Sequence, residues 1–476
     1  MTSQVSKVAH WVGGTRHEAD GGEPGRSRAA RLPRSMSPMG TPAPPRRPSL
    51  HHCRRFLFYC NEMVGLGHLR RTLAIADRLA QTHDDVTSLV ITGCPVESIF
   101  GLPPRTETVK LPVRTRDAHG HARSRLVLEL EELRALRGQI ALAVATAFDP
   151  DVAVVDKLPL GVDGELEPTL RALRGRDGRC KLVLGLRDID DSPANVRRNW
   201  GVGMREAILR YYDAILVYGP ASTPDAIACM GWSRLDVPVL HVGYVGAPMP
   251  ATGPDDLPDG YLLATSGAGH DGFELLATLG EAIRAEPLPC DTVMVAGPLR
   301  DPDKLEQLRR LTMGLPVRLY AYRTDLPHLI VGARAVVSMA GYNTVGDIMR
   351  TRKPALLVPR VRPSEEQLIR AQRLKRRGLQ QMLHPADVRP ATLRAELDTL
   401  LARPAPPLEL ADYTGAERTV DVLAAMAGLG RPRPAAFPAA RRPASTRQAG
   451  VMLVHAAALR VRRGTAALHQ RHGEHA

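Results

Sequence analysis

Short apolar runs alternate with amphipathic stretches through the middle of the chain. The first set of runs, bounded by polar turns, predicts β-strands at 56–59, 88–91, 152–155, 182–186, 214–218 and 239–242. Helical periodicity separates most of them, at 71–80, 125–147 and 204–211. Strands that alternate with helices usually pair in parallel, so the pattern predicts a doubly wound α/β sheet.

Residues 244–259 interrupt this rhythm with four prolines and predict a linker. Beyond it the alternation resumes, with strands predicted at 261–265, 292–296, 317–320, 335–338 and 355–358 and a last helix at 416–427. We therefore predict two Rossmann-like, doubly wound parallel-sheet domains facing a cleft, an N-terminal one over 53–243 and a C-terminal one over 260–429. Ligands of such sheets bind at the carboxyl ends of the strands.

Both ends of the chain lack a hydrophobic period. Residues 1–52 are rich in Pro, Gly, Ser and Arg, and two explanations fit them equally well. One is a disordered segment, and the other is a start codon assigned too early, with Met36 and Met39 as candidate starts. Residues 430–476 predict a second disordered basic tail, interrupted by a basic amphipathic helix at 451–461.

Composition narrows the candidate partners. The formal charge of +14 suits a nucleic acid or a membrane surface, but only seven of the 64 Lys and Arg residues are lysine. Such an arginine excess is typical of GC-rich coding and lies largely in the tails, so we predict no nucleic-acid partner. The six cysteines have no metal-ligand spacing, and no run reaches the ~20 apolar residues of a membrane span. We predict a cytoplasmic protein without cofactor, with peripheral contact to the inner membrane face left open.

The strongest motif of the N-terminal half is Gly65-Leu66-Gly67-His68-Leu69-Arg70-Arg71, directly after the first strand. Glycines let a backbone approach a ligand closely, and a new helix presents free N–H groups to an anion. The helix dipole disfavours a protonated imidazole there, so His68 is predicted to be a neutral base. Arg71 is a cation in the first helical turn and needs a nearby anion. A solvated turn with surface basic residues is the alternative.

Acidic residues end two strands of the same half. Asp156 follows the strand 152–155 and is predicted to orient His68, while a salt bridge to Lys157 or Arg187 is the alternative. A D-x-D pattern at 188–190 is common by chance, and we predict that it binds no metal. The candidates for acceptor contact at this edge are Arg187, Asp188 and Asp191.

Two motifs lie in the C-terminal half. The loop Thr265-Ser266-Gly267-Ala268-Gly269-His270 follows a strand, and the segment Met339-Ala340-Gly341-Tyr342-Asn343-Thr344-Val345-Gly346-Asp347 follows another. Pro354–Pro359, Glu366-Gln367 and Ala371 come next. A carboxylate can accept from two vicinal hydroxyls at once, so Asp347 suits a ribose. Helix capping boxes at 344–347 and 364–367 are the alternative.

These motifs resemble those of sugar-nucleotide enzymes with the GT-B fold, in particular glycosyltransferase family 28, which glycosylates the lipid-linked peptidoglycan precursor. That family shows a G-x-G-H-x-x-R-like turn, [GS]-G-x-x-T-x-x-E, G-x-P-x-x-x-x-P and Q-x-x-x-A at similar spacings. The first motif is also similar to that of the UDP-sugar hydrolases of pseudaminic-acid biosynthesis. The chain departs from the family at Ala264 and Thr265, which replace glycines, at Asp347, which replaces glutamate, and at Lys353, which replaces glycine.

The resemblance implies a hexosyltransferase that moves a sugar from a nucleoside-diphosphate sugar, expected to be a UDP-sugar, to an acceptor hydroxyl with inversion and without a metal. The acceptor stays open between a lipid-linked, a polysaccharide and a small-molecule hydroxyl. His68 and Asp156 are the predicted catalytic residues. The predicted donor-binding residues are Gly67, Arg71, Ser266, Gly267, Tyr322, Arg323, Gly341, Thr344, Asp347 and Gln367. A UDP-sugar hydrolase and a non-catalytic nucleotide-sugar-binding protein remain alternatives.

Overall fold

The computed structural model describes residues 53–60, 66–116, 122–175, 178–223, 225–232, 235–407 and 412–430. The two tails predicted at 1–52 and 430–476, the helix predicted at 451–461 and the first glycine of the His68 motif, Gly65, lie outside the described residues, apart from residue 430 itself. Within the described ranges, no helix is long and apolar enough to cross a membrane.

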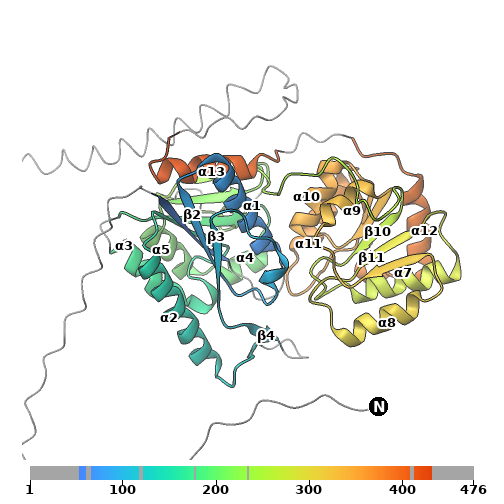
Figure 1. Cartoon of the computed structure of the whole chain (residues 1–476), viewed down its shortest axis with the longest axis horizontal. Helices are drawn as coiled ribbons and strands as arrows, with labels where there is room; N and C mark the ends of the chain where they lie inside the picture. Colours follow the sequence, from blue (N-terminus) through green and yellow to red (C-terminus); the bar gives the residue numbers. More distant parts are fainter. Residues whose placement is uncertain are drawn as a thin grey trace, which may run out of the picture. The chain divides into compact units, whose positions relative to one another are not determined.

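The first sheet has seven strands in the order β3-β2-β1-β6-β7-β8-β9, and every pairing is parallel (Figure 1). Its strands are β1 (Arg54–Cys60), β2 (Val86–Thr92), β3 (Thr106–Lys110), β6 (Val152–Asp156), β7 (Lys181–Arg187), β8 (Ala214–Tyr218) and β9 (Val239–His241). The connecting helices are α1 (Gly67–Thr82), α2 (Leu130–Phe148), α3 (Glu167–Arg174), α4 (Pro193–Asn199), α5 (Val202–Tyr211) and α6 (Ala226–Cys229). Strands β6 and β8 are buried at every position, as expected for a sheet covered on both faces.

The second sheet has six parallel strands in the order β12-β11-β10-β13-β14-β15. They are β10 (Leu262–Thr265), β11 (Thr292–Val295), β12 (Val317–Tyr320), β13 (Ala335–Ser338), β14 (Ala355–Leu357) and β15 (Gln381–Met382). The helices are α7 (Phe273–Ala285), α8 (Pro302–Thr312), α9 (Leu326–Gly332), α10 (Tyr342–Thr351), α11 (Glu366–Arg376) and α12 (Pro390–Ala402). A last helix, α13 (Gly415–Met426), packs on α1 of the first sheet.

Each sheet reverses its strand order at one point, between β1 and β6 in the first and between β10 and β13 in the second. At such a point the two flanking connections leave to opposite faces of the sheet and open a crevice outside the carboxyl ends of the strands. The first crevice lies beside the start of α1 and the end of β6. The second receives the β10–α7 loop and the β13–α10 turn. Both crevices therefore carry the motifs singled out in the sequence.

The fold predicted from the apolar pattern is confirmed, since two doubly wound parallel sheets are present and every predicted strand overlaps an observed one. The start of one predicted helix is wrong. The helix expected from residue 125 begins at Leu130, because Glu129 and Glu132 form a capping box there. The sequence pattern also missed β3, β15 and the hairpin of β4 (Arg114–Arg116) and β5 (Ala122–Ser124). Strand β3 is an edge strand with one buried residue, so it carries no apolar run.

Candidate functional site

His68 lies at the first crevice, at the second position of α1. Its Nδ1 is 2.9 Å from Oδ2 of Asp156, the last residue of the neighbouring strand β6. Its Nε2 is 2.6 Å from Nη2 of Arg187 at the end of β7. The ionised carboxylate of Asp156 can only accept, so the proton of the neutral ring lies on Nδ1, and Nε2 accepts from the guanidinium of Arg187. Nη2 of Arg71 also lies 3.0 Å from Nδ1.

A buried arginine fixes the carboxylate of Asp156. Nη2 of Arg71 lies 2.7 Å and 2.5 Å from its two oxygens. The guanidinium of Arg71 also stacks on the rings of Tyr218, at 4.9 Å, and Tyr342, at 5.4 Å. Burial opposes ionisation of Asp156, but Arg71 and its other charged neighbours hold the pKa of this carboxyl well below its usual range. Asp156 is therefore a permanent anion at neutral pH.

The electrostatic setting keeps the imidazole neutral. Burial, together with the positive charges of Arg187 and Arg71, lowers the pKa of His68 to about 4 against the opposing effect of Asp156. Only 8% of the residue is exposed. His68 is thus a neutral ring at neutral pH, oriented by a carboxylate, as a general base must be.

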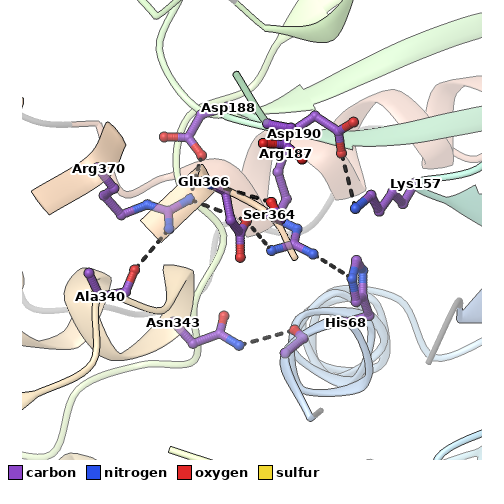
Figure 2. A network of polar contacts seen from close by, with 12 residues as sticks. His68, Lys157, Arg187, Asp188, Asp190, Ala340, Asn343, Ser364, Glu366 and Arg370 are labelled. Atoms are coloured by element: carbon purple, nitrogen blue, oxygen red, sulfur yellow. Dashed lines mark hydrogen bonds and ion pairs between the residues drawn. The ribbon is translucent and has the colours of Figure 1, made fainter. Parts of the chain in front are cut away.

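Arg187 connects this base to the second sheet (Figure 2). Its Nη1 lies 2.5 Å from Oε2 of Glu366, the first residue of α11. Burial opposes ionisation of Glu366, yet Arg187, Arg370 and other cations lower its pKa to about 2. Arg370 also donates to the carbonyl of Ala340 at 2.9 Å, before α10. A continuous series of charged contacts therefore runs from α11 through Arg187 to the base.

The donor segment predicted around α10 faces α1. Oδ2 of Asp347 lies 2.7 Å from Nη2 of Arg70, and this carboxylate is buried. Asn343 donates to the carbonyl of Gly67 at 3.0 Å, as Figure 2 shows. Gly341 is the N-cap residue of α10, and Thr344 is buried within its first turn. The structure therefore brings Gly67, Asp347 and the first turn of α10 together, beside a small pocket that Arg70, Asn343 and Asp347 help to line.

The second glycine loop is shaped by its glycines and by one buried arginine. Gly269 has φ +92°, and a Cβ there would meet the carbonyl of Ala296 at 2.6 Å, so only glycine fits. Ser266 donates to the carbonyl of Ala296 at 2.6 Å and accepts from Nη2 of Arg300 at 2.9 Å. Arg300 is buried and donates also to the carbonyl of Asp271, and burial lowers its pKa. All of these acceptors are uncharged oxygens.

The other predicted donor residues take separate positions. Gln367 accepts from the backbone N–H of Arg360 at 3.1 Å. Gly267 has φ +68° in the second glycine loop. Tyr322 is 49% exposed, beyond the end of β12. Arg323 forms ion pairs with Asp256 and Asp325, each at 2.6 Å. Their roles as donor contacts stay predictions.

The D-x-D pattern does not converge on one point. Asp188 accepts from Tyr244 at 3.2 Å and lies 3.4 Å from Arg370, whereas Asp190 pairs with Lys157 at 3.2 Å and accepts from Trp200 at 3.0 Å. In the part of the chain that the structure describes, no group of three His, Cys, Asp or Glu side chains is placed to hold a metal ion. Each carboxylate of the pattern is instead part of an ion pair.

Several residues of this site carry weak signals in the sequence. Arg70 is adjacent to Arg71 in one helical turn, and only the structure shows that Arg70 reaches Asp347 while Arg71 reaches Asp156. Glu366 appears in the sequence as a capping residue. Its i,i+4 spacing to Arg370 was the available sign of a charged role. Tyr342 gave no sign, although its ring is buried against the core of the first sheet.

Comparison with known proteins agrees with this architecture. Residues 292–424 match the profile of the glycosyltransferase family 28 C-terminal domain. No curated protein shows significant sequence similarity to the chain.

Solved structures match most of the chain. The MnaA–UDP complex from S. aureus aligns with a TM-score of 0.52 at 12% identity, covering 81% of this chain and 100% of that one. A putative UDP-N-acetylglucosamine 2-epimerase from Listeria monocytogenes gives 0.50 at 12% identity, with coverage of 80% and 98%. MurG from Acinetobacter baumannii gives 0.49 at 14% identity, with coverage of 78% and 98%. At this identity, the first two show a shared fold.

Proposed function

We propose that this protein moves a hexosyl group from a UDP-sugar to an acceptor hydroxyl with inversion. The premise is that the chain is a glycosyltransferase with a family 28 C-terminal domain over residues 292–424. The observation that carries this proposal is the pair of His68 and Asp156 at the strand reversal of the first sheet. A single side chain, Arg187, contacts both His68 of this pair and Glu366 of helix α11, which belongs to the matched domain.

The proposed chemistry is a single displacement. Nε2 of His68 takes the proton of the acceptor hydroxyl, and the oxygen attacks the anomeric carbon of the donor sugar. The bond from that carbon to the diphosphate oxygen breaks, and UDP leaves from the opposite face, which inverts the configuration. Asp156 holds Nδ1–H and stabilises the imidazolium that forms. General-base assistance of this kind contributes about 10²–10⁴-fold to the rate.

The second sheet supplies donor binding in this proposal. Asp347 exchanges Arg70 for the ribose hydroxyls, Gln367 contacts the sugar, and the diphosphate lies against Ser266 and Gly267 at the start of α7. The contacts of Asp188 and Asp190 with Arg370 and Lys157 support a reaction that needs no metal at the D-x-D pattern. The buried charge of Arg71 is directed to Asp156, so its predicted phosphate contact depends on a rearrangement.

A nucleotide-release assay over a panel of UDP-, GDP- and dTDP-sugars tests this function, with and without candidate acceptors. We expect release from a UDP-sugar that requires an acceptor and gives a product of inverted anomeric configuration by proton NMR. Release with water alone at the same rate identifies a UDP-sugar hydrolase. Binding of UDP without release from any donor identifies a non-catalytic binding protein.

A further inference from the structure

The side chain of Arg187 occupies the free nitrogen of the proposed base, His68. Arg187 donates from Nη2 to Nε2 of His68 at 2.6 Å and from Nη1 to Glu366 at 2.5 Å. Its side chain is 14% exposed. Its Nε is buried and has no hydrogen-bond partner among the described residues. Arg187 therefore links α11 to the imidazole, and its Nε–H is left without a partner.

The contact to Nε2 blocks the proposed reaction in this arrangement. Nδ1 carries a proton that faces Asp156, so Nε2 holds the only lone pair with which His68 can accept a proton. An acceptor hydroxyl must come within hydrogen-bond distance of that lone pair before it can lose its proton. It cannot do so while the guanidinium is 2.6 Å away. Arg187 must leave Nε2 before the reaction can begin.

We propose that Arg187 gates the base. Its Nη2 stays bonded to Nε2 of His68 until a phosphate oxygen of the donor replaces Nε2 as the acceptor. Arg187 then binds the leaving diphosphate. This inference rests on the proposed function. Phosphate oxygens suit a planar guanidinium fork, and the unused Nε supplies a second parallel donor. Because Arg187 stays tied to Glu366, beside the predicted sugar contact Gln367, it remains next to the departing diphosphate.

The gate has a second consequence for the base. The charged groups around His68 are Asp156 at the end of β6, Arg71 on α1, Arg187 at the end of β7 and, through Arg187, Glu366 on α11. Arg71 is fixed on Asp156 and cannot leave without uncovering a buried anion. Arg187 is the cation on Nε2, so its departure both frees the lone pair and removes a positive charge. The base gains proton affinity when the donor binds.

Titration of His68 by NMR in protein labelled at the histidine nitrogens tests the gate without any turnover, with His68→Gln assigning the signal. In wild type without nucleotide, we expect His68 to stay neutral down to pH 5. In Arg187→Gln its pKa should rise by about one to two units, the effect of losing a like charge in contact. UDP should raise the pKa in wild type and much less in Arg187→Gln.

Arg360→Gln is the matched control. Arg360 also faces Glu366, at 3.7 Å, and pairs with Asp271, but the structure shows no contact of its side chain with His68. It should leave the titration of His68 unchanged. If Arg187→Gln fails to fold, as its melting curve would show, Arg187→Lys takes its place. A lysine cannot bind Glu366 and Nε2 together as a fork does, so the UDP-dependent rise should still shrink.

Steady-state kinetics completes the experiment. Arg187→Gln should move the acid limb of the kcat/KM profile to higher pH, in parallel with the pKa of His68 measured by NMR. It should also lower kcat at pH 8, since the leaving group loses a cation. An unchanged titration in Arg187→Gln overturns the gate, and so does a wild-type pKa that UDP does not move. If both titrations behave as expected but no donor is ever turned over, the gate stands as a nucleotide-dependent contact and the transferase proposal fails.

Discussion

The two strand reversals of this protein are equivalent in topology but opposite in chemistry. At the first, the neutral imidazole of His68 lies among three charged side chains, Arg71, Asp156 and Arg187. At the second, a loop bent by Gly267 and Gly269 presents backbone, and the buried cation beside this loop, Arg300, binds uncharged oxygens. The same fold therefore builds a titratable site at one sheet and a site of fixed dipoles at the other.

In the proposed function the two sites have different tasks. Proton transfer needs a group whose pKa is set by its surroundings, and burial among opposing charges is the means of setting it. Binding a diphosphate needs hydrogen-bond donors and a net positive field, and helix N-termini with glycine turns provide both without a titratable group. The predictions below test whether chemistry belongs to the first reversal and donor binding to the second.

The largest effect is expected at His68. His68→Ala should lower turnover by about 10²–10⁴-fold while UDP affinity changes little, because the base acts on the acceptor and the donor lies mainly on the second sheet. His68→Gln should be nearly as poor, since an amide cannot take a proton. The measurement is nucleotide release beside UDP binding by calorimetry.

His83→Ala is the matched control for this change. His83 is the C-cap residue of the same helix, and its ring contacts Thr82. Its loss should leave turnover unchanged. If His68→Ala turns over normally, the base is elsewhere and the division of labour between the two reversals is wrong. If it loses UDP binding instead, His68 is a phosphate ligand.

The fold was accessible from the sequence because the strands of parallel sheets are continuous apolar runs. Runs such as 152–155 and 214–218 are buried at every position and could be read directly. Strand β3 was missed for the converse reason, since an edge strand with one buried residue has no such run. Its existence depends on pairing with β2, which no local pattern encodes.

The sequence predicted contacts of the site only where the local strand and helix structure determines where a side chain lies. His68 and Asp156 follow adjacent strands, so the rule for strand ends was enough to bring them together, and the structure places them 2.9 Å apart. The sequence predicts Arg187 at the edge of the cleft, but its bridge between His68 and Glu366 joins residues far apart in sequence. The same holds for Arg70 and Asp347. Contacts of this kind depend on tertiary packing.

The next largest effect is expected at Asp347. A ligand that binds only the folded protein raises its stability with concentration, so UDP should raise the melting temperature. Asp347→Ala should weaken UDP binding by about 10–100-fold, the usual worth of hydrogen bonds to a charged group. Asp347→Glu should retain or improve binding, because glutamate is the usual residue of the family at this position. Calorimetry and thermal shift measure both variants.

Two controls sharpen this test. Because Asp347→Ala also strips Arg70 of its partner, each UDP-induced shift must be taken relative to the same variant without UDP. Asp303→Ala, on the exposed surface of α8 in the second sheet region, should bind UDP as wild type does. If Asp347→Ala binds UDP with wild-type affinity, this carboxylate does not bind the ribose, and the proposed donor role of α10 is wrong.

A smaller effect is expected on stability at mildly acid pH. The pKa of His68 is lowered to about 4 in the folded protein, against about 6.5 in an unfolded chain. As pH falls through 6.5, the unfolded state therefore binds a proton that the folded state does not, and stability is lost down to about pH 4. Between pH 7 and pH 5 this should cost about 2 kcal/mol.

Urea unfolding of wild type and His68→Gln at pH 7 and pH 5 measures this loss of stability. The other histidines are the same in both proteins, so their contributions cancel in the comparison. The pKa values of Asp156 and Glu366 are lowered, so these carboxylates lose their partners' stabilisation only at lower pH. The variant should lose less stability than wild type over this window. An equal loss in both would show that His68 is not held neutral by its surroundings.

The smallest effect is expected from chelation of metals. Turnover should be unchanged in EDTA, because the charge of the diphosphate is met by the N–H groups of the second glycine loop and by arginine side chains. Asp188 and Asp190 contact Arg370 and Lys157, and a metal would have to break both pairs. Nucleotide release is compared in EDTA and in calcium-saturated EDTA, with Asp190→Asn beside wild type. Loss of activity that manganese restores in wild type, but not in Asp190→Asn, would place a metal among the charges of the first reversal. The fixed dipoles of the second would then be insufficient to hold the leaving group.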